Sequence, residues 1–102
     1  MTQRMHWLAM DFGIYPIDSK WIDVGGIFIF TKLNEENRWV PLYIGQVSSF
    51  KERFSKHESL EEAKKLGVTH IHAKTVPKQA DRNLIERRLI ESYQPLFNSQ
   101  HR

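Results

Sequence analysis

Two hydrophobic stretches near the middle of the chain have the composition of paired β-strands. Residues 25–32 and 38–46 are rich in β-branched and aromatic side chains, and the polar sequence Leu-Asn-Glu-Glu-Asn separates them. Strands this close along the chain are expected to pair as a hairpin. Pro41 has no backbone N–H to donate, so we expect the second strand to lie at a sheet edge or to carry a bulge there.

Two short helices are predicted after the hairpin. Ser48 or Ser49 can accept hydrogen bonds from the unpaired N–H groups of a first helical turn, and two phenylalanines follow one turn apart. The sequence Ser-Leu-Glu-Glu at residues 59–62 has the spacing of a capping box and predicts the start of the second helix. Gly67 can adopt the left-handed conformation that ends this helix.

One further strand and one longer helix complete the pattern. Residues 68–76 alternate between apolar and polar side chains, which predicts a strand that ends at Pro77. A helix is predicted over residues 79–93, because the residue before Pro95 is disfavoured in the helical conformation. The resulting order, β-β-α-α-β-α, predicts an α/β fold with a small three-stranded antiparallel sheet flanked by helices.

The first 24 residues carry too many large apolar side chains for a disordered arm. They are Trp7, Phe12, Tyr15, Trp21 and Ile22. We therefore expect residues 1–24 to form an N-terminal arm that packs on the sheet or on a second copy of the protein. Residues 25–102 are expected to form the domain itself.

Length and composition limit the class of protein. With 102 residues the chain fits a single domain, and no segment is apolar over the eighteen or so residues that a membrane helix needs. The first residues lack an apolar run with a small-residue cleavage site, so we expect no secretion signal. The absence of cysteine excludes disulfides and thiolate metal sites and fits a reducing compartment. We therefore expect a cytoplasmic location and no membrane contact.

The positive charge of the chain is concentrated in its second half. Residues 51–102 carry eleven Lys/Arg against seven Asp/Glu, residues 1–50 carry four against five, and the net charge is +3. This bias suits an anionic partner such as nucleic acid, and a solvated surface is the alternative that charge alone leaves open. The residues expected to supplement phosphate binding are Lys51, Lys56, Arg87 and Arg88.

Several short motifs follow the predicted elements in a fixed order. Residues 26–28 read Gly-Ile-Phe on the first strand of the hairpin, and residues 43–45 read Tyr-Ile-Gly on the second. The residues that follow on later elements are Arg53, His57, Glu86 and Asn98. Through this order and spacing, residues 26–98 resemble the GIY-YIG endonuclease family. Phe28 stands where the first motif of the family has a tyrosine.

The tripeptide Gly-Ile-Tyr also occurs literally, at residues 13–15. Pro16 follows it directly and would remove a hydrogen-bond donor from a central strand. This tripeptide also lies well before Tyr43, with another hydrophobic strand between them. Gly26 and Phe28 instead lie on the strand that is predicted to pair with the Tyr43 strand, so we assign the first motif to them.

Glu86 lies within the apolar arc of the helix predicted over residues 79–93. At about 100° per residue, it falls beside Ile85 and Ile90 rather than opposite them. A carboxylate on that side needs a partner, and Mg²⁺ or Mn²⁺ held by one carboxylate, water and phosphate oxygens suits a phosphodiester site. The competing interpretation is an ion pair with Arg82, one turn earlier on the same face.

Arg53 and His57 are one turn apart on the flank of the first predicted helix, so both are expected to emerge beside the sheet. A guanidinium there can hold a phosphate with two donors and stabilise the charge of the transition state. For His57, whose ring type titrates near neutral pH, orienting water, binding phosphate and passing a proton are all open. An amphipathic helix with a basic edge is the structural alternative.

Tyr43 is expected to face the side of its strand opposite Leu42 and Ile44. The family resemblance implies a catalytic hydroxyl here, acting as general base or positioning water. A phenol holds its proton at neutral pH, so this role needs cationic neighbours such as Arg53 and a metal ion. A strand tyrosine with a hydrogen-bonded tip is the alternative.

Gly45 and Asn98 complete the expected site, and two histidines are weighed beside them. Gly45 is expected to allow a tight turn after its strand and a close approach to a ligand. Asn98 is expected to tie the C-terminal segment to the site, and the resemblance implies a supporting role for it. His70 and His72 share one face of the strand 68–76, but two imidazoles are too few for a metal site, so we expect surface residues.

The resemblance implies a metal-dependent endonuclease that hydrolyses DNA phosphodiester bonds, with Glu86 as the ligand of Mg²⁺ or Mn²⁺. RNA remains open as a substrate. Two other functions also remain open: a catalytically weak or inactive nucleic-acid-binding module, which Phe28 favours, and a protein-interaction domain, which residues 1–24 favour. Any site specificity is expected to come from that segment, a homodimer or an accessory DNA-recognition protein.

Overall fold

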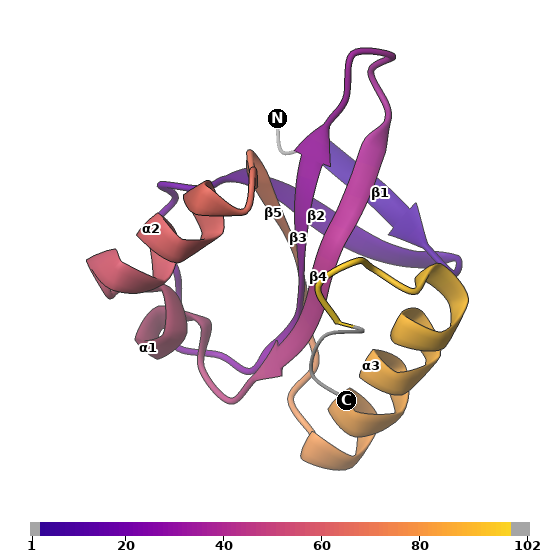
Figure 1. Ribbon diagram of the computed structural model, residues 1–102. Coiled ribbons are helices and arrows are strands. Elements are labelled where there is room, and N and C mark those ends of the chain that lie inside the picture. Colours follow the sequence, from indigo (N-terminus) through magenta and orange to yellow (C-terminus); the bar gives the residue numbers. More distant parts are fainter. Residues whose placement is uncertain (1–2, 99–102) are drawn as a thin grey trace.

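The computed structural model describes residues 3–98, apart from the side chains of His57 and Ser59, as a five-stranded antiparallel sheet with helices on both faces (Figure 1). The elements are β1 (Gln3–Trp7), β2 (Met10–Pro16), β3 (Gly26–Leu33), β4 (Trp39–Val47), α1 (Phe50–Phe54), α2 (His57–Lys65), β5 (His70–Thr75) and α3 (Gln79–Tyr93). Across the sheet the strands lie in the order β1-β2-β5-β3-β4, so β1 and β4 are its edges. No helix within residues 3–98 is long and apolar enough to cross a bilayer.

The element order predicted from residue 26 onward is confirmed. β3 and β4 form the expected hairpin, with Phe28 opposite Gly45, and β5 pairs with the other side of β3. The α/β class is therefore correct. The expected three-stranded sheet is wrong, because two more strands precede this hairpin in the chain and join the same sheet.

Residues 3–16 supply the two additional strands. β1 pairs with β2, and β2 pairs with β5, where Gly13 lies opposite Ala73. Trp7 and Phe12 are only 3% and 0% exposed, so the segment belongs to the core. Leu8 and Ala9 form the hairpin turn, with φ of 50° and 64°. Turns with two left-handed residues usually contain Asn and Gly, so these two side chains gave no indication of a turn in the sequence.

The two candidate tripeptides lie on different strands. Residues 13–15 are on β2, and two strands, β5 and β3, separate them from β4. Gly26 and Phe28 are on β3, directly beside the strand that carries Tyr43. Residues 26–28, to which we assign the first motif, therefore pair with the Tyr43 strand as expected.

β4 is irregular at its middle. Phe30 pairs with Tyr43, and the next pair is Thr31 with Pro41. Leu42 is therefore an extra residue, which forms a bulge in an edge strand. The expectation for Pro41 is confirmed.

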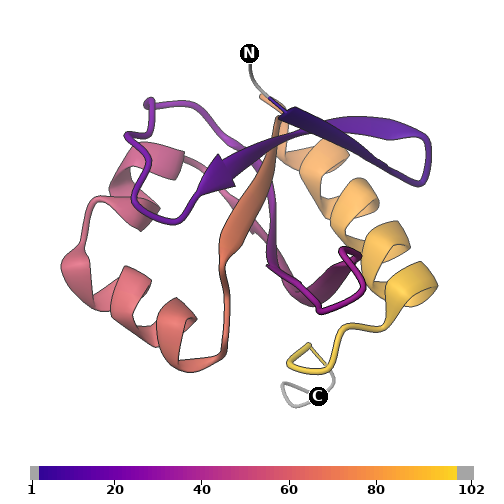
Figure 2. The same ribbon diagram turned by 90° about the horizontal axis from the view of Figure 1, so that it is seen from above.

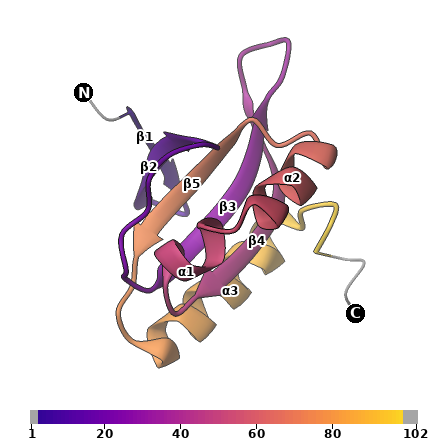
Figure 3. The same cartoon turned by 90° about the vertical axis from the view of Figure 1, so that its left-hand side faces the viewer.

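The two faces of the sheet carry separate hydrophobic clusters. α1 and α2 cover one face and α3 covers the other, as Figures 1 and 2 show, and Figure 3 places α1 and α2 in front of the sheet. The cluster beneath α1 and α2 includes Phe28, Phe30, Phe50, Phe54 and Ile71. The cluster beneath α3 includes Trp7, Ile27, Ile29, Ile44 and Leu89. Alternate residues of β3 therefore contact different helices. In β4 the bulge interrupts this alternation, since Leu42 and Tyr43 both join the cluster beneath α1 and α2. The expectation that Tyr43 faces away from Leu42 is therefore wrong.

The start of α1 and the end of α3 follow local sequence signals, as predicted. The hydroxyl of Ser49 caps α1 and accepts a hydrogen bond from the N–H of Glu52 at 3.2 Å. α3 spans the predicted residues and ends at Gln94, which has a left-handed conformation directly before Pro95. Short-range sequence signals therefore decide these boundaries.

The start of α2 differs from the prediction. The helix begins at His57, after a cap residue, Lys56, that makes no side-chain hydrogen bond to it. The predicted capping box at 59–62 was wrong, because the chain enters the helix directly after the bend at residues 55–56. Gly67 follows the helix with φ of 90°, as expected for a left-handed terminator.

Candidate active site

Tyr43 belongs to the aromatic cluster on the sheet face that α1 and α2 cover. Its ring centroid lies 6.0 Å from those of Phe28 and Phe30 on the neighbouring strand. Tyr43 is half-buried and packs against this cluster. The strand register therefore holds its ring beside the side chain at the first motif position.

Arg53 lies on α1 above the same aromatic side chains. Its Cζ is 6.0 Å from the centroid of the Phe28 ring and 5.6 Å from that of Phe54. A guanidinium over an aromatic face gains electrostatic attraction to the ring. Phe28 is therefore a common neighbour of Arg53 and Tyr43.

Gly45 makes room for the Phe28 ring. A Cβ atom at Gly45 would lie 2.5 Å from Cζ of Phe28, closer than real contacts allow. β4 continues through Gly45 to Val47, so the expected tight turn after this residue is wrong. Gly26 is equally crowded, since a Cβ there would lie 2.1 Å from the carbonyl oxygen of Lys74.

Glu86 is half-buried on α3 and is held by a glutamine from β4. Nε2 of Gln46 donates to Oε1 of Glu86 at 3.1 Å and to Oδ1 of Asn83 at 2.7 Å. Sequence reasoning missed both amides. Gln46 shares a strand face with Ile44, and Asn83 lies one helical turn before Glu86, so both positions were accessible to pattern analysis.

Arg82 is directed away from Glu86. Its Nη1 donates to the carbonyl oxygens of Val76 at 3.0 Å and Pro77 at 2.8 Å, and the residue is buried. Within residues 3–98, Glu86 makes no ion pair with it. The competing interpretation of Glu86 as half of an internal ion pair is therefore wrong.

A surface depression of about 490 Å³ brings several expected site residues together. Its lining includes Tyr43, Asn83, Glu86, Arg87, Ile90 and Asn98. Arg53 is not part of this lining; it lies beside Phe28, whose ring centroid is 6.0 Å from that of Tyr43. Glu86 and Arg87 of α3 and Tyr43 of β4 therefore border one open surface, although the Tyr43 ring packs in the cluster on the other face of the sheet.

Asn98 fastens the segment after α3 to the free edge of β4. Its Nδ2 donates to the carbonyl oxygen of Ile44, and its Oδ1 accepts from the N–H of the same residue, both at 2.8 Å. Phe97 adds a backbone hydrogen bond to the carbonyl oxygen of Leu42 at 3.1 Å. The expected tie between the C-terminal segment and the site is thus present.

The remaining expected cations are dispersed. Lys56 and Arg88 are exposed, and neither lines the depression. Lys51 is exposed on α1 and lines a different hollow. His57 begins α2, and its side chain lies outside the described part of the structure. Arg87 is thus the expected phosphate-binding residue that lies closest to Glu86 in the fold.

His72 is buried, contrary to the surface position that we expected. It is 0% exposed, and its Nδ1 accepts a hydrogen bond from Nε1 of Trp7 at 2.9 Å. Burial, and secondarily the nearby His70, lowers the pKa of His72 from 6.5 to about 4. The error arose because Trp7 comes from β1, a strand that the sequence did not reveal.

The donor set around Glu86 suits only a loosely held hard cation. Within the described residues, no three His, Asp or Glu side chains converge as a metal site. A single carboxylate in an open depression, beside amide groups, fits Mg²⁺, which keeps several waters and is completed by phosphate oxygens. The residues present are thus compatible with the expected ion when a phosphate is also bound.

Comparison with known proteins gives no relative. No family model matches the chain, and neither the curated proteins nor the solved structures contain a match.

Proposed function

We propose that this protein is a metal-dependent endonuclease of the GIY-YIG type that hydrolyses DNA phosphodiester bonds. The observation that carries the proposal is the shared depression of Tyr43, Glu86 and Asn98, three motif residues from β4, α3 and the segment after it. The second support is Arg53, which neighbours the first motif position, Phe28.

The proposed roles follow from the side chains that line the depression. Glu86 holds Mg²⁺, and the hydrogen bond from Gln46 orients its carboxylate. When bound, the ion supplies positive charge to a phosphate oxygen. Arg87 neutralises the DNA backbone at the rim, and Arg53 stabilises charge on the other side of Tyr43. Tyr43 positions the attacking water or accepts its proton.

The test is Glu86→Gln, which removes the charge and keeps the size of the side chain. We expect Mg²⁺-dependent cleavage of plasmid DNA to fall by roughly a hundredfold or more, while DNA binding changes little. Asp81→Asn is the matched control, because it removes one exposed carboxylate from the same helix outside the depression. Cleavage by Glu86→Gln at the rate of the unmodified protein would refute the assignment.

A nucleic-acid-binding module with weak or no activity is the second candidate. The observation that favours it is Phe28, which is 2% exposed, contacts Arg53 and Tyr43 and has no hydroxyl. If the missing hydroxyl takes part in proton transfer, its absence costs about 10²–10⁴ in rate. Phe28→Tyr should then raise cleavage by a similar factor in a plasmid-nicking assay. An unchanged rate would show that Tyr43 needs no second phenol.

A further inference from the structure

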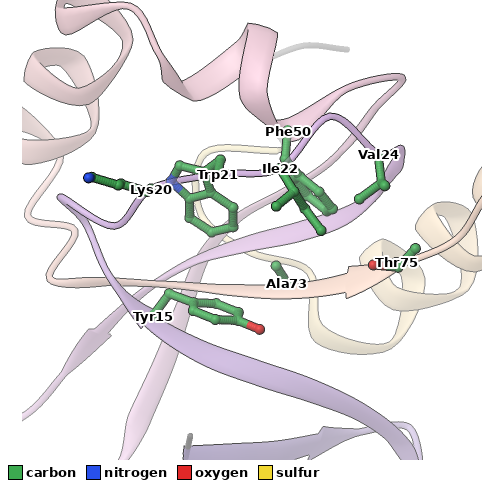
Figure 4. Close-up of a pocket in the computed structure, with 8 residues that line it drawn as sticks. All are labelled: Tyr15, Lys20, Trp21, Ile22, Val24, Phe50, Ala73 and Thr75. Carbon is green, nitrogen blue, oxygen red and sulfur yellow. The ribbon is translucent and has the colours of Figure 1, made fainter.

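A second hollow lies on the α1 side of the sheet, away from Glu86. It has a volume of about 220 Å³ and is lined mainly by apolar side chains. Figure 4 shows Trp21 and Ile22, from the segment between β2 and β3, facing Ala73 and Thr75 of β5, with Tyr15 of β2 beside them. None of these residues takes part in the proposed cleavage.

The aromatic walls of this hollow are held in place by packing. The Tyr15 ring lies over Gly13, where a Cβ atom would be 2.5 Å from the tyrosine oxygen. Trp21 meets Tyr15 edge-on at 5.3 Å between centroids and packs on Phe50 at 5.5 Å and Phe54 at 5.1 Å. Tyr15 of the literal Gly-Ile-Tyr tripeptide, which the first motif does not use, thus forms one wall.

A polar hollow of about 400 Å³ adjoins the apolar one. Its lining is Ser19, Lys20, Trp21, Lys51, Phe54 and Ser55, so the two hollows share Lys20 and Trp21. Two ammonium groups and two hydroxyls are suitable partners for a phosphate.

We propose that these paired hollows bind one unpaired nucleotide of a DNA strand, with its base against Trp21 and its phosphate between Lys20 and Lys51. The apolar hollow, at about 220 Å³, is smaller than the roughly 300 Å³ at which sites for drug-sized ligands begin, so it suits a single ring system. Bases stack on aromatic side chains without strong sequence preference. Lys51 lies on α1, the helix that also carries Arg53.

The inference takes DNA as the polymer from the proposed function, but binding can be measured without cleavage. The probes are a short oligothymidylate and the same strand with abasic residues in place of its bases, both in excess EDTA. We expect tighter binding of the base-containing strand and quenching of tryptophan fluorescence by it. Trp21→Ala should weaken binding of this strand roughly five- to 150-fold and leave the abasic strand unaffected. Equal affinity of the unmodified protein for both strands would overturn the proposal.

A second variant tests the site independently, in case Trp21→Ala does not fold. Lys20 and Lys51 are exposed, so the double change to Gln should preserve the fold and weaken oligothymidylate binding several-fold more than its control. The control is Lys64→Gln with Lys65→Gln, two exposed lysines on α2 with the same loss of charge. Equal weakening by both pairs would contradict a local phosphate site. Base-dependent binding that persists while Glu86→Gln and the unmodified protein cleave DNA equally would separate this site from the proposed nuclease function.

Discussion

Gly45 and Phe28 are a matched pair across two strands. The Phe28 ring occupies the space that any side chain at Gly45 would need, and Arg53 lies on the other side of the cluster, 6.0 Å from that ring. The glycine of the second motif is thus explained by packing rather than by an unusual backbone angle. The position of the Arg53 guanidinium depends on this packing.

Gly45→Ala should therefore destabilise the protein. A Cβ atom 2.5 Å from the Phe28 ring must displace it, and such overpacking costs about 1–3 kcal/mol. Urea unfolding would measure the loss. In the double variant with Phe28→Leu, the smaller side chain leaves room, so the two changes together should cost less than their sum. A stable Gly45→Ala variant would show that the Phe28 ring is free to move.

Among the helices and strands, the sequence predicted those boundaries that depend on residues only a few positions apart. α3 was predicted over its full length, because the helical periodicity and Pro95 both act within a few residues. The β1–β2 hairpin was missed, because Leu8 and Ala9 adopt left-handed angles that their side chains do not favour. The N–H of Leu8 donates to the hydroxyl of Tyr93 at 3.0 Å, so contact with α3 stabilises the turn from a distance.

The sequence predicted on which element each candidate site residue lies, but not the depression that these residues share. Tyr43 and Glu86 could be assigned to a strand and a helix face, and Asn98 to the segment after it, from local patterns. Their common depression depends on how α3 packs on β4, which no local pattern contains. The direction of Arg82 toward the carbonyls of Val76 and Pro77 is likewise a result of tertiary packing.

Replacing the β1–β2 turn with Leu8→Asn and Ala9→Gly should stabilise the protein. Both new residues tolerate the observed positive φ angles, and the backbone hydrogen bond of residue 8 to Tyr93 does not depend on its side chain. We expect a gain of about 1 kcal/mol, measured as a higher melting temperature. The control, Leu8→Ser with Ala9→Ser, makes both turn residues polar without this preference and should give no gain. Equal melting temperatures for the two double variants would contradict the explanation.

For the whole molecule, the proposed active site extends across the edge of the sheet. Arg53 and Glu86 come from helices on opposite faces, and β4 with Tyr43 lies between them (Figure 1). Asn98 and Phe97 occupy the β4 edge beside Tyr43. A DNA strand that reaches both Arg53 and an ion held by Glu86 must therefore pass along this edge, so the packing of both helical layers on the sheet determines the geometry of the site.

His72 links the pH of the solution to the stability of the whole molecule. Its imidazole is buried between Trp7 and Trp39, with ring centroids at 5.6 Å and 4.7 Å. In the described part of the chain its Nε2 has no partner, while its Nδ1 accepts from Trp7, so the ring is neutral with its proton on Nε2. Protonation of Nδ1 would remove that hydrogen bond and place a charge in the core.

The free energy of unfolding should therefore fall as the pH is lowered from about 6.5 to about 4. The pKa of His72 is about 4 in the folded protein and 6.5 as the ordinary value, so in this window only the unfolded chain gains the proton. The expected slope from this group is about 1.4 kcal/mol per pH unit at most. Urea unfolding across this range should show a shallower fall for His72→Gln, which does not titrate, and an unchanged one for the exposed control His6→Gln. Parallel pH profiles for His72→Gln and the unmodified protein would mean that the folded state accommodates the charged ring.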